Sequence, residues 1–275
     1  MPSAYPRHQD TAQASVEHPM KIQPRPILTS IVATVIALAF CANTKAAEVN
    51  VLASLAIKPV IETIGPSFER TSGHTLVTRF ELTPVVKRQA EDGAAFDIAI
   101  ANPSHIEDLI KQGKLATGSR VDIAAFGVGV GVRAGAPKPD VSSPDAFKRA
   151  LLSAKTVAYV GEGTSGEFVR GLLGRLGISE VMKEKLKPAG VPASLASVAA
   201  GEAEIVVMPV PLILSHTGVE LAGALSPELQ DNIVMTAGLS TSAKDAAAAR
   251  AFVEFLMAAE VTTVVKAKGY QRLTQ

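Results

Sequence analysis

Hydroxyl-bearing and small residues recur in this sequence at points where an apolar strand pattern gives way to a helical pattern. Ser54 ends the strand pattern of residues 48–54, and Thr83 precedes a proline that suits the first position of a helix. Further along the chain, Ser165 and Gly166 close a glycine-rich loop before another helical pattern. Backbone N–H groups at a helix start are unpaired and bind anions, although the same hydroxyls would also serve as simple helix caps. We therefore predict an anion-binding cleft walled by helix starts.

Other binding chemistries fit the sequence less well. The glycine-rich loop 161–166 lacks the lysine of a nucleotide phosphate loop, and the glycines of residues 127–131 lie inside a strand pattern that no helix directly follows. His74, His105 and His216 are scattered without the spacing of metal ligands. We therefore expect no metal site and no cofactor.

The charge and cysteine content exclude further classes. Lysine and arginine number 27 against 26 aspartates and glutamates, and the formal net charge is +1. Nucleic-acid binding requires a basic excess, so we expect no nucleic-acid partner. The single cysteine, Cys41, lies in a segment that we expect to be removed, which leaves no thiol for a disulfide, a metal site or catalysis.

Residues 20–47 have the layout of a secretory signal peptide, because two basic residues precede an apolar run that ends in small residues. We expect cleavage after Ala46 or Ala47 and a periplasmic mature protein. Residues 1–19 are polar and aperiodic, and they place the basic start of the signal inside the chain. We interpret them as a non-native upstream extension and expect translation to begin at Met20.

Two alternatives for the leader stay open. The apolar run would act as a retained membrane anchor if it were not cleaved, but it is shorter than the roughly 20 residues of a spanning helix. Cys41 would be lipidated in a lipoprotein, but Phe40 is large for the position before a lipidated cysteine. The signal peptide is the interpretation that we carry forward.

Strand and helix patterns alternate along the rest of the chain, which predicts an α/β fold with helices layered on mostly parallel sheets. Residues 121–132 form a long apolar run spotted with glycine, and we place the first crossing between two lobes there. Within the helix expected at 55–71, Gly65 and Pro66 predict a kink or a restart. Ser104 opens a capping-box pattern that predicts the start of another helix.

Several segments resemble the molybdate-type periplasmic solute-binding proteins of ABC transporters. These segments are the A-S-L of residues 53–55, the stretch 80–89, the E-D-G-A-A-F-D-I-A-I-A-N of residues 91–102 and the K-A-K-G-Y of residues 266–270. The resemblance spans nearly the whole mature chain. It implies the two-lobed type II periplasmic binding protein fold, in which each lobe is a mostly parallel sheet flanked by helices and a hinge joins the lobes. Residues 48–127 plus 233–275 would form lobe 1, and residues 128–232 would form lobe 2.

Proteins of that family hold an oxyanion without counter-charge, through two serine hydroxyls, backbone N–H groups and a tyrosine. The resemblance implies that the two hydroxyl donors are Ser54 and Thr83 in this chain. The proline-alanine-glycine stretch of the family falls on residues 164–166, which implies ligand contacts at Ser165 and Gly166. A backbone donor at the start of the next helix falls on Val191.

The chain departs from the family pattern at three positions. The tyrosine position falls on Met208, whose thioether cannot donate the hydrogen bond of a phenol. Leu82 stands where the family has serine, and Glu81 brings a carboxylate next to the site, where it would raise the cost of binding a dianion. We therefore expect a small anion, either a molybdate-like oxyanion or a small carboxylate, as the ligand. The other expected partner is the membrane permease of an ABC transporter, and we expect the binding protein to be a monomer.

An enzyme is the alternative. The V-R-A-G-A-P-K-P-D segment of residues 132–140 resembles the branch of the family that includes bacterial aconitate isomerases. Such an enzyme shifts an allylic proton on a tricarboxylate, and it needs a base near an acidic C–H together with donors that hold carboxylates. Glu81 or Glu162 would be that base, and Arg79 or Arg88 would steady a carboxylate.

Overall fold

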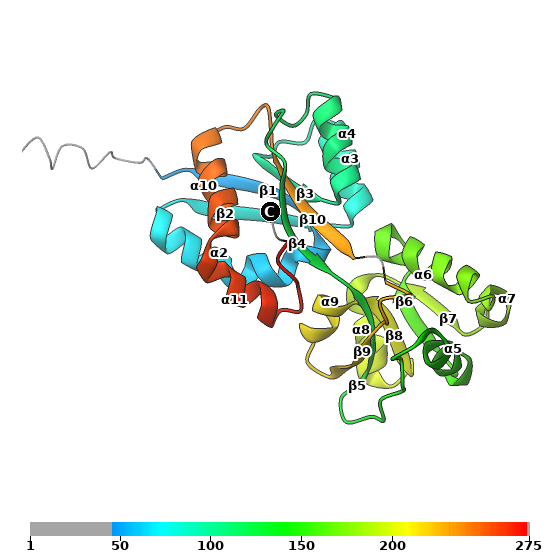
Figure 1. Cartoon of the computed structure of the whole chain (residues 1–275). Helices are drawn as coiled ribbons and strands as arrows, with labels where there is room; N and C mark the ends of the chain where they lie inside the picture. The colour runs from blue at the N-terminus through cyan, green and yellow to red at the C-terminus, as the bar shows by residue number, and fades with distance from the viewer. Residues whose placement is uncertain (1–45, 231, 274–275) are drawn as a thin grey trace, which may run out of the picture. The chain divides into compact units, whose positions relative to one another are not determined.

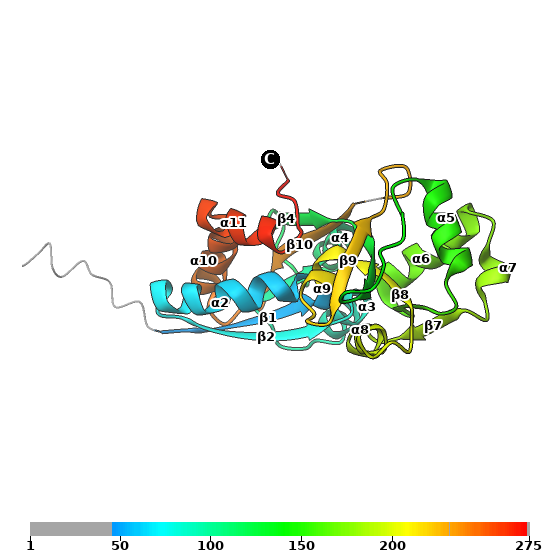
Figure 2. The same cartoon turned by 90° about the horizontal axis from the view of Figure 1, so that it is seen from below.

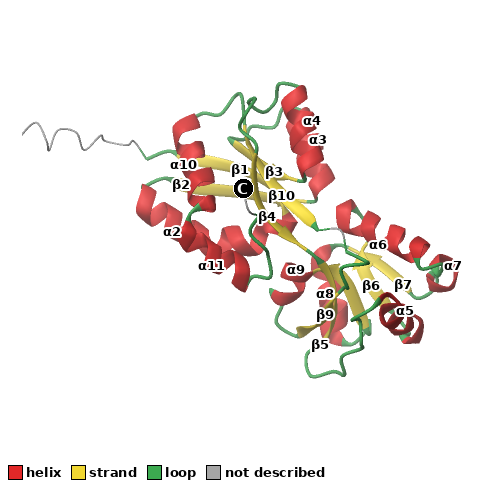
Figure 3. Ribbon diagram, in the orientation of Figure 1, coloured by secondary structure: helices red, strands yellow, loops and turns green. Residues whose placement is uncertain are grey.

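The structure is a computed structural model that describes residues 46–230 and 232–273. The predicted upstream extension and the signal peptide up to residue 45 lie outside the described residues, and so do Met20 and Cys41. The strands are β1 (Glu48–Ser54), β2 (Thr75–Glu81), β3 (Ile98–Ala101), β4 (Val121–Phe126), β5 (Val128–Arg133), β6 (Val157–Val160), β7 (Leu186–Ala189), β8 (Ile205–Pro209), β9 (Val219–Ala224) and β10 (Ile233–Leu239). Figures 1 and 3 show them in two separate sheets.

The helices alternate with these strands along the chain. They are the short 3-10 helix η1 (Leu55–Ile57), α2 (Lys58–Ser72), α3 (Thr83–Glu91), α4 (Pro103–Lys111), α5 (Pro144–Ser153), α6 (Gly163–Arg175), α7 (Ser179–Met182), α8 (Val191–Ala200), α9 (Val210–Leu214), α10 (Ala246–Met257) and α11 (Ala259–Ala267). The α/β class predicted from the alternating patterns is confirmed.

The two sheets share one topology. The first has the strand order β2-β1-β3-β10-β4, and the second has the order β7-β6-β8-β5-β9. In each sheet the first two pairings are parallel and the other two are antiparallel. Each sheet is therefore mixed: four of its five strands run in the same direction, as predicted, and only β10 in the first sheet and β5 in the second run against them. The reason is that β10 and β5 each enter a sheet directly from the other sheet, so no crossover helix forces them to run parallel to their neighbours.

Helices cover both faces of each sheet (Figure 2). Helices α3 and α4 pack on one face of the first sheet, and α2 and α10 pack on the other. Helices α8 and α9 cover one face of the second sheet, whereas α5 and α6 cover the opposite face. Because both faces of the central strands are buried, their sequences read as continuous apolar runs rather than as alternating ones.

The chain crosses from the first sheet to the second through a single residue, Gly127, between β4 and β5. The side chain of Gln230, on the returning segment, fixes this point: its Oε1 accepts from the Val128 N–H at 2.7 Å and its Nε2 donates to the Leu225 carbonyl at 2.7 Å. A Cβ at position 127 would lie 2.0 Å from the Gln230 Oε1. Glycine at position 127, which has no Cβ, therefore leaves room for the Gln230 side chain.

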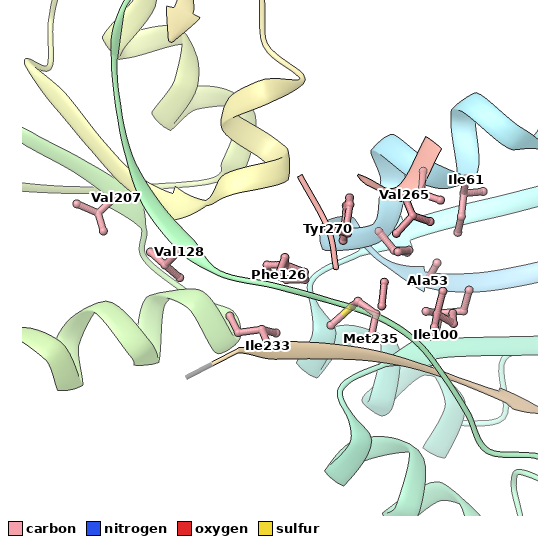
Figure 4. Close-up of a cluster of buried hydrophobic side chains, with 14 of the residues drawn as sticks. Ala53, Ile61, Ile100, Phe126, Val128, Val207, Ile233, Met235, Val265 and Tyr270 are labelled. Carbon is pink, nitrogen blue, oxygen red and sulfur yellow. The ribbon is translucent and has the colours of Figure 1, made fainter. Parts of the chain in front are cut away.

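The buried core continues along this crossing from one sheet to the other (Figure 4). Phe126 and Val128 stand on either side of Gly127, and Ile233 begins the returning strand; all three are buried. The Phe126 ring packs edge-on against the Tyr270 ring, with the centroids 5.6 Å apart. Apolar side chains thus pack beside the crossing strands.

Two of the predicted helix boundaries, a restart at Gly65-Pro66 and a start at Ser104, are wrong. Helix α2 runs unbroken past Gly65 and Pro66, because Ile64 and Phe68 are buried against the core and that packing outweighs the one hydrogen bond that a proline removes. Helix α4 begins at Pro103, so Ser104 lies inside its first turn and is not the cap. A proline at the first helical position presets the backbone there.

Candidate functional site

A cavity of about 30 Å³ lies between the two sheets. The carboxyl ends of strands in the first sheet face it from one side, and the N-termini of helices that pack on the second sheet face it from the other. Ser54 and Thr83 line it from the first sheet's side, and Ser165 and Val191 line it from the second. Four of the six residues predicted as ligand contacts therefore line the same cavity. This volume exceeds the roughly 10–15 Å³ that one water molecule needs, so the cavity has room for a small guest.

Ser54 and Thr83 meet directly at this cavity. The Ser54 Oγ lies 2.9 Å from the Thr83 Oγ1, and both residues are buried, at 2% and 6% exposure. The Ser54 Oγ also accepts from the Ala56 N–H at 3.2 Å, which caps η1 as predicted. Thr83 is the first residue of α3 and makes no capping bond, because Leu82 is the N-cap residue. The Thr83 hydroxyl is therefore not needed by its own helix and points to its neighbour Ser54.

The start of α6 forms the opposite wall. Gly163 has a φ of 75°, in the left-handed region that glycine tolerates, and it follows the N-cap residue Glu162, whose side chain makes no capping bond. The Thr164 Oγ1 donates to the Asn102 Oδ1 at 3.1 Å, which joins α6 to the start of α4 in the first lobe. Gly166 packs against the end of β6, where a Cβ would come 2.4 Å from the Val160 carbonyl oxygen. Gly166 thus lets α6 approach the sheet but is not among the lining residues.

Helix N-termini contribute partial positive charge to the cavity. The first turns of α3, α6 and α8 border the cavity, and each helix N-terminus carries a partial positive charge of roughly half an elementary charge. Val191 is the first residue of α8. No lysine or arginine is among the described lining residues, and the one charged residue, Glu162, is exposed at the rim. An anion in this cavity would therefore meet neutral hydroxyl and backbone donors.

The structure places the other candidate residues away from the cavity. Met208 is fully buried and faces α8 and α9 in the apolar cluster of the second sheet, while the next residue, Pro209, lines the cavity. Glu81, at the end of β2, is not among the lining residues and accepts from the Gln89 Nε2 at 3.4 Å. Arg79 is exposed and donates to the Ala95 carbonyl at 2.7 Å. Arg88 is exposed on α3.

Two residues of the site were missed in the sequence. Asn102 lines the cavity at the end of β3, and the Asn-Pro pair that starts α4 was the available signal. Tyr270 supports the site from behind, because its hydroxyl donates to the Ala56 carbonyl in η1. Burial raises the pKa of the Tyr270 phenol, so the group stays protonated and remains a donor. The K-A-K-G-Y segment thus holds the helix start at Ser54.

Ionisable side chains join α3 to α4. The Lys87 Nζ and the Asp108 Oδ2 are 2.7 Å apart, and this hydrogen bond is the main reason that the pKa of Lys87 is raised and that of Asp108 lowered. His105 lies on the same helix as Asp108, and burial, followed by the charge of Lys87, lowers its pKa. Within residues 46–230 and 232–273, no three histidine, cysteine or acidic side chains gather as metal ligands would, and no helix is both long and apolar enough to cross a membrane.

Comparison with known proteins decides the family. The model of the bacterial extracellular solute-binding protein family matches residues 49–271. This chain belongs to that family. The solute-binding protein is 30% identical over 257 residues to the molybdate-binding protein ModA of Azotobacter vinelandii, which covers 87% of this chain and 96% of ModA. It is also 26% identical over 226 residues to an aconitate isomerase of a Pseudomonas species, which covers 80% of this chain and 86% of the isomerase.

A solved structure confirms the fold. The periplasmic molybdate-binding protein of Azotobacter vinelandii superposes on the solute-binding protein with a TM-score of 0.70 and 21% identity, covering 82% of this chain and all of the other. The two-lobed type II periplasmic binding protein fold and the molybdate-type family, both inferred from the resemblance, are therefore confirmed. The roles of the individual site residues stay predictions.

Proposed function

We propose that this solute-binding protein takes a small anion in the cavity between its two sheets and delivers it to the permease of an ABC transporter. The observation that carries the proposal is the convergence of the Ser54 and Thr83 hydroxyls with the first turns of α6 and α8. Fixed neutral donors of this kind bind an anion without needing a counter-ion. The similarity to a molybdate-binding protein supports the same class of ligand.

The proposal extends to location and organisation. We propose that the mature protein starts near Ala46 or Ala47 and acts as a monomer in the periplasm. Lobe 1 would consist of residues 48–127 plus 233–275 and lobe 2 of residues 128–232, so that the hinge falls at Gly127 and the returning segment. Ser165, Gly166 and Val191 would contact the anion through the starts of α6 and α8, and Met208 would support the site only through the apolar core.

A ligand panel tests the proposal. Molybdate, tungstate, sulfate, phosphate, citrate and cis- and trans-aconitate are added separately to the purified protein, and thermal unfolding is followed. A ligand present at 100 times its dissociation constant should stabilise the native state by about 2.7 kcal/mol. The proposal predicts a clear rise in melting temperature with at least one of these anions and none with sodium chloride at equal ionic strength. Equal curves for all of them would refute it.

A second candidate function is aconitate isomerisation. It is favoured by the 26% identity to an aconitate isomerase and by Glu162, which lines the cavity and is the one charged residue there among those described. In that case Glu162 would move the allylic proton, and the helix starts would hold carboxylates. The purified protein should then convert trans-aconitate to the cis form, with Glu162→Gln inactive and Glu81→Gln active. Absence of turnover at high protein concentration would refute this candidate.

A further inference from the structure

A second and larger hollow lies in the second lobe, at the end of its sheet remote from the cavity. Its volume is about 720 Å³, within the range of small-molecule sites. Ile205, at the start of β8, lines this hollow, whereas Pro209, at the other end of the strand, lines the cavity. Four residues of strand rise separate them by about 13 Å. The hollow is therefore distinct from the interlobe site.

The floor of the hollow is apolar. Val132 from β5 and Ile205 from β8 contribute buried side chains on the sheet face that α5 covers. Ala146, Ala150 and Ser153 stand on one side of α5 at helical spacing. Because these three residues are small, they leave open a space between the helix and the sheet that larger side chains would fill.

The rim of the hollow carries arginines. Arg133 ends β5 and Arg149 lies on α5; both are exposed and both line the hollow. Among the described residues, neither guanidinium has a carboxylate oxygen within ion-pair distance. Gly201 stands beside Arg133, since a Cβ there would come within 3.4 Å of the Arg133 Nη1. Two planar donors that suit carboxylates thus stand over an apolar floor.

The other charged residues of the rim have polar partners, and the pKa of Asp140 is lowered by hydrogen bonds from Ser142 and then by the charge of Arg149. Lys138 pairs with Glu220 at 3.0 Å. The Asp140 Oδ1 accepts from the Ser142 N–H at 3.0 Å and from its hydroxyl at 2.7 Å. A second lining carboxylate, Glu204, accepts from the Lys155 N–H at 2.8 Å.

The loop that forms the rim is fixed in place. Pro137 and Pro139 restrict its backbone, and the Ala134 N–H donates to the Gly218 carbonyl at 2.9 Å. The Gly135 N–H donates to the Glu220 Oε1 at 3.3 Å. The hollow therefore exists before a ligand arrives, and little ordering opposes binding.

We propose that this hollow is a second binding site, which takes an organic carboxylate with an apolar body. The carboxylate lies between Arg133 and Arg149, and the apolar body fills the space between α5 and the sheet. Neither the interlobe cavity nor the delivery of its anion requires this site. The segment 132–140, which resembles the aconitate isomerase branch of the family in sequence, supplies much of its rim.

Nuclear magnetic resonance of the ¹⁵N-labelled protein tests the proposal with three matched probes: octanoate, octylamine and octan-1-ol. Octanoate should shift the amide signals of residues 132–140 and of α5 but leave those of Ser54 and Thr83 in place. Octylamine and octan-1-ol should each bind at least tenfold more weakly, which corresponds to about 1.4 kcal/mol. Equal shifts with octylamine, shifts confined to the interlobe cavity, or no shift with octanoate up to its solubility limit would each overturn the proposal.

Variants test which residues of the hollow bind octanoate. Arg133→Gln and Arg149→Gln should each weaken octanoate binding at least tenfold, whereas Arg250→Gln, an exposed arginine on α10, should leave it unchanged. Ala150→Leu should narrow the space between α5 and the sheet and weaken octanoate binding, whereas Ala247→Leu, on an exposed position of α10, should not. Unchanged melting temperatures identify variants that have folded. Octanoate binding that survives both arginine replacements would overturn the proposal.

Discussion

Replacing Thr83 with valine removes a hydroxyl from the interlobe cavity and preserves almost everything else. Valine has nearly the same shape and the same branching at Cβ, so the packing of this buried position and the start of α3 should be retained. The Thr83 hydroxyl makes no capping bond to its own helix, and its partner is the Ser54 Oγ at 2.9 Å. After the replacement, Ser54 keeps the Ala56 N–H as a donor.

The two expected effects differ in size. Loss of one neutral hydrogen bond between the hydroxyls should lower the free energy of unfolding of the empty protein by about 0.5–1.5 kcal/mol. A hydrogen bond to a charged ligand is worth about 1.5–3 kcal/mol, so the affinity for the bound anion should fall roughly 10- to 150-fold. The affinity should therefore respond more strongly than the stability does.

Isothermal titration calorimetry with the anion that most stabilises the protein measures the affinity, and urea denaturation without ligand measures the stability. Thr71→Val is the matched control, because Thr71 is exposed at the end of α2 and bonds to the Ser67 carbonyl of its own helix. The control should leave the affinity unchanged. If Thr83→Val binds the anion as tightly as the unaltered protein while its stability falls, Thr83 has only a structural role and the proposed site is wrong.

Three other predictions follow from the same contacts. Gly166→Ala should lower the free energy of unfolding by about 2 kcal/mol or more, because its Cβ would lie 2.4 Å from the Val160 carbonyl oxygen. Gly171→Ala is the control on the same helix: a Cβ there meets open space, so the free energy of unfolding should rise by about 0.5–1 kcal/mol. Urea denaturation measures both. Tyr270→Phe should lower the free energy of unfolding by about 1 kcal/mol and weaken anion binding, because the Ala56 carbonyl in η1 loses its hydrogen bond from the Tyr270 hydroxyl. If calorimetry gives the same anion affinity for the variant and the unaltered protein, Tyr270 does not support the anion site. Burial lowers the pKa of His105 in the folded protein, so the unfolded chain takes up a proton more readily, and the free energy of unfolding should fall as the pH drops below about 6.5. Urea denaturation at several pH values should show a smaller fall in His105→Gln. An equal fall in the variant would contradict this reasoning.

The sequence predicted the class of fold and much of the site because both depend on local patterns. The strand that ends at Ser54 and the glycine-rich segment 161–166, whose last four residues open α6, are contiguous segments whose pattern can be read directly. Met208 was placed by resemblance alone, and its burial on the α8 face depends on the register of β8, which a sequence pattern alone does not fix.

Features that depend on contacts distant in sequence were not predictable in the same way. The bond between Tyr270 and Ala56 joins residues far apart along the chain, and so does the bond between Thr164 and Asn102. The continuity of α2 through Pro66 depends on tertiary packing that outweighs local propensity. The mixed character of the sheets follows from where the chain changes lobes, which requires the pairing of β10 to be known.

The peptide groups at the starts of α6 and α8 are present whatever side chains the gene encodes there, with proline as the exception. A substitution at Leu82, Glu162 or Val191 would alter the size and polarity of the rim while these main-chain donors stay in place. Descendants of one ancestral scaffold could therefore change the anion they accept through a few substitutions at the rim, without rebuilding the part that neutralises its charge.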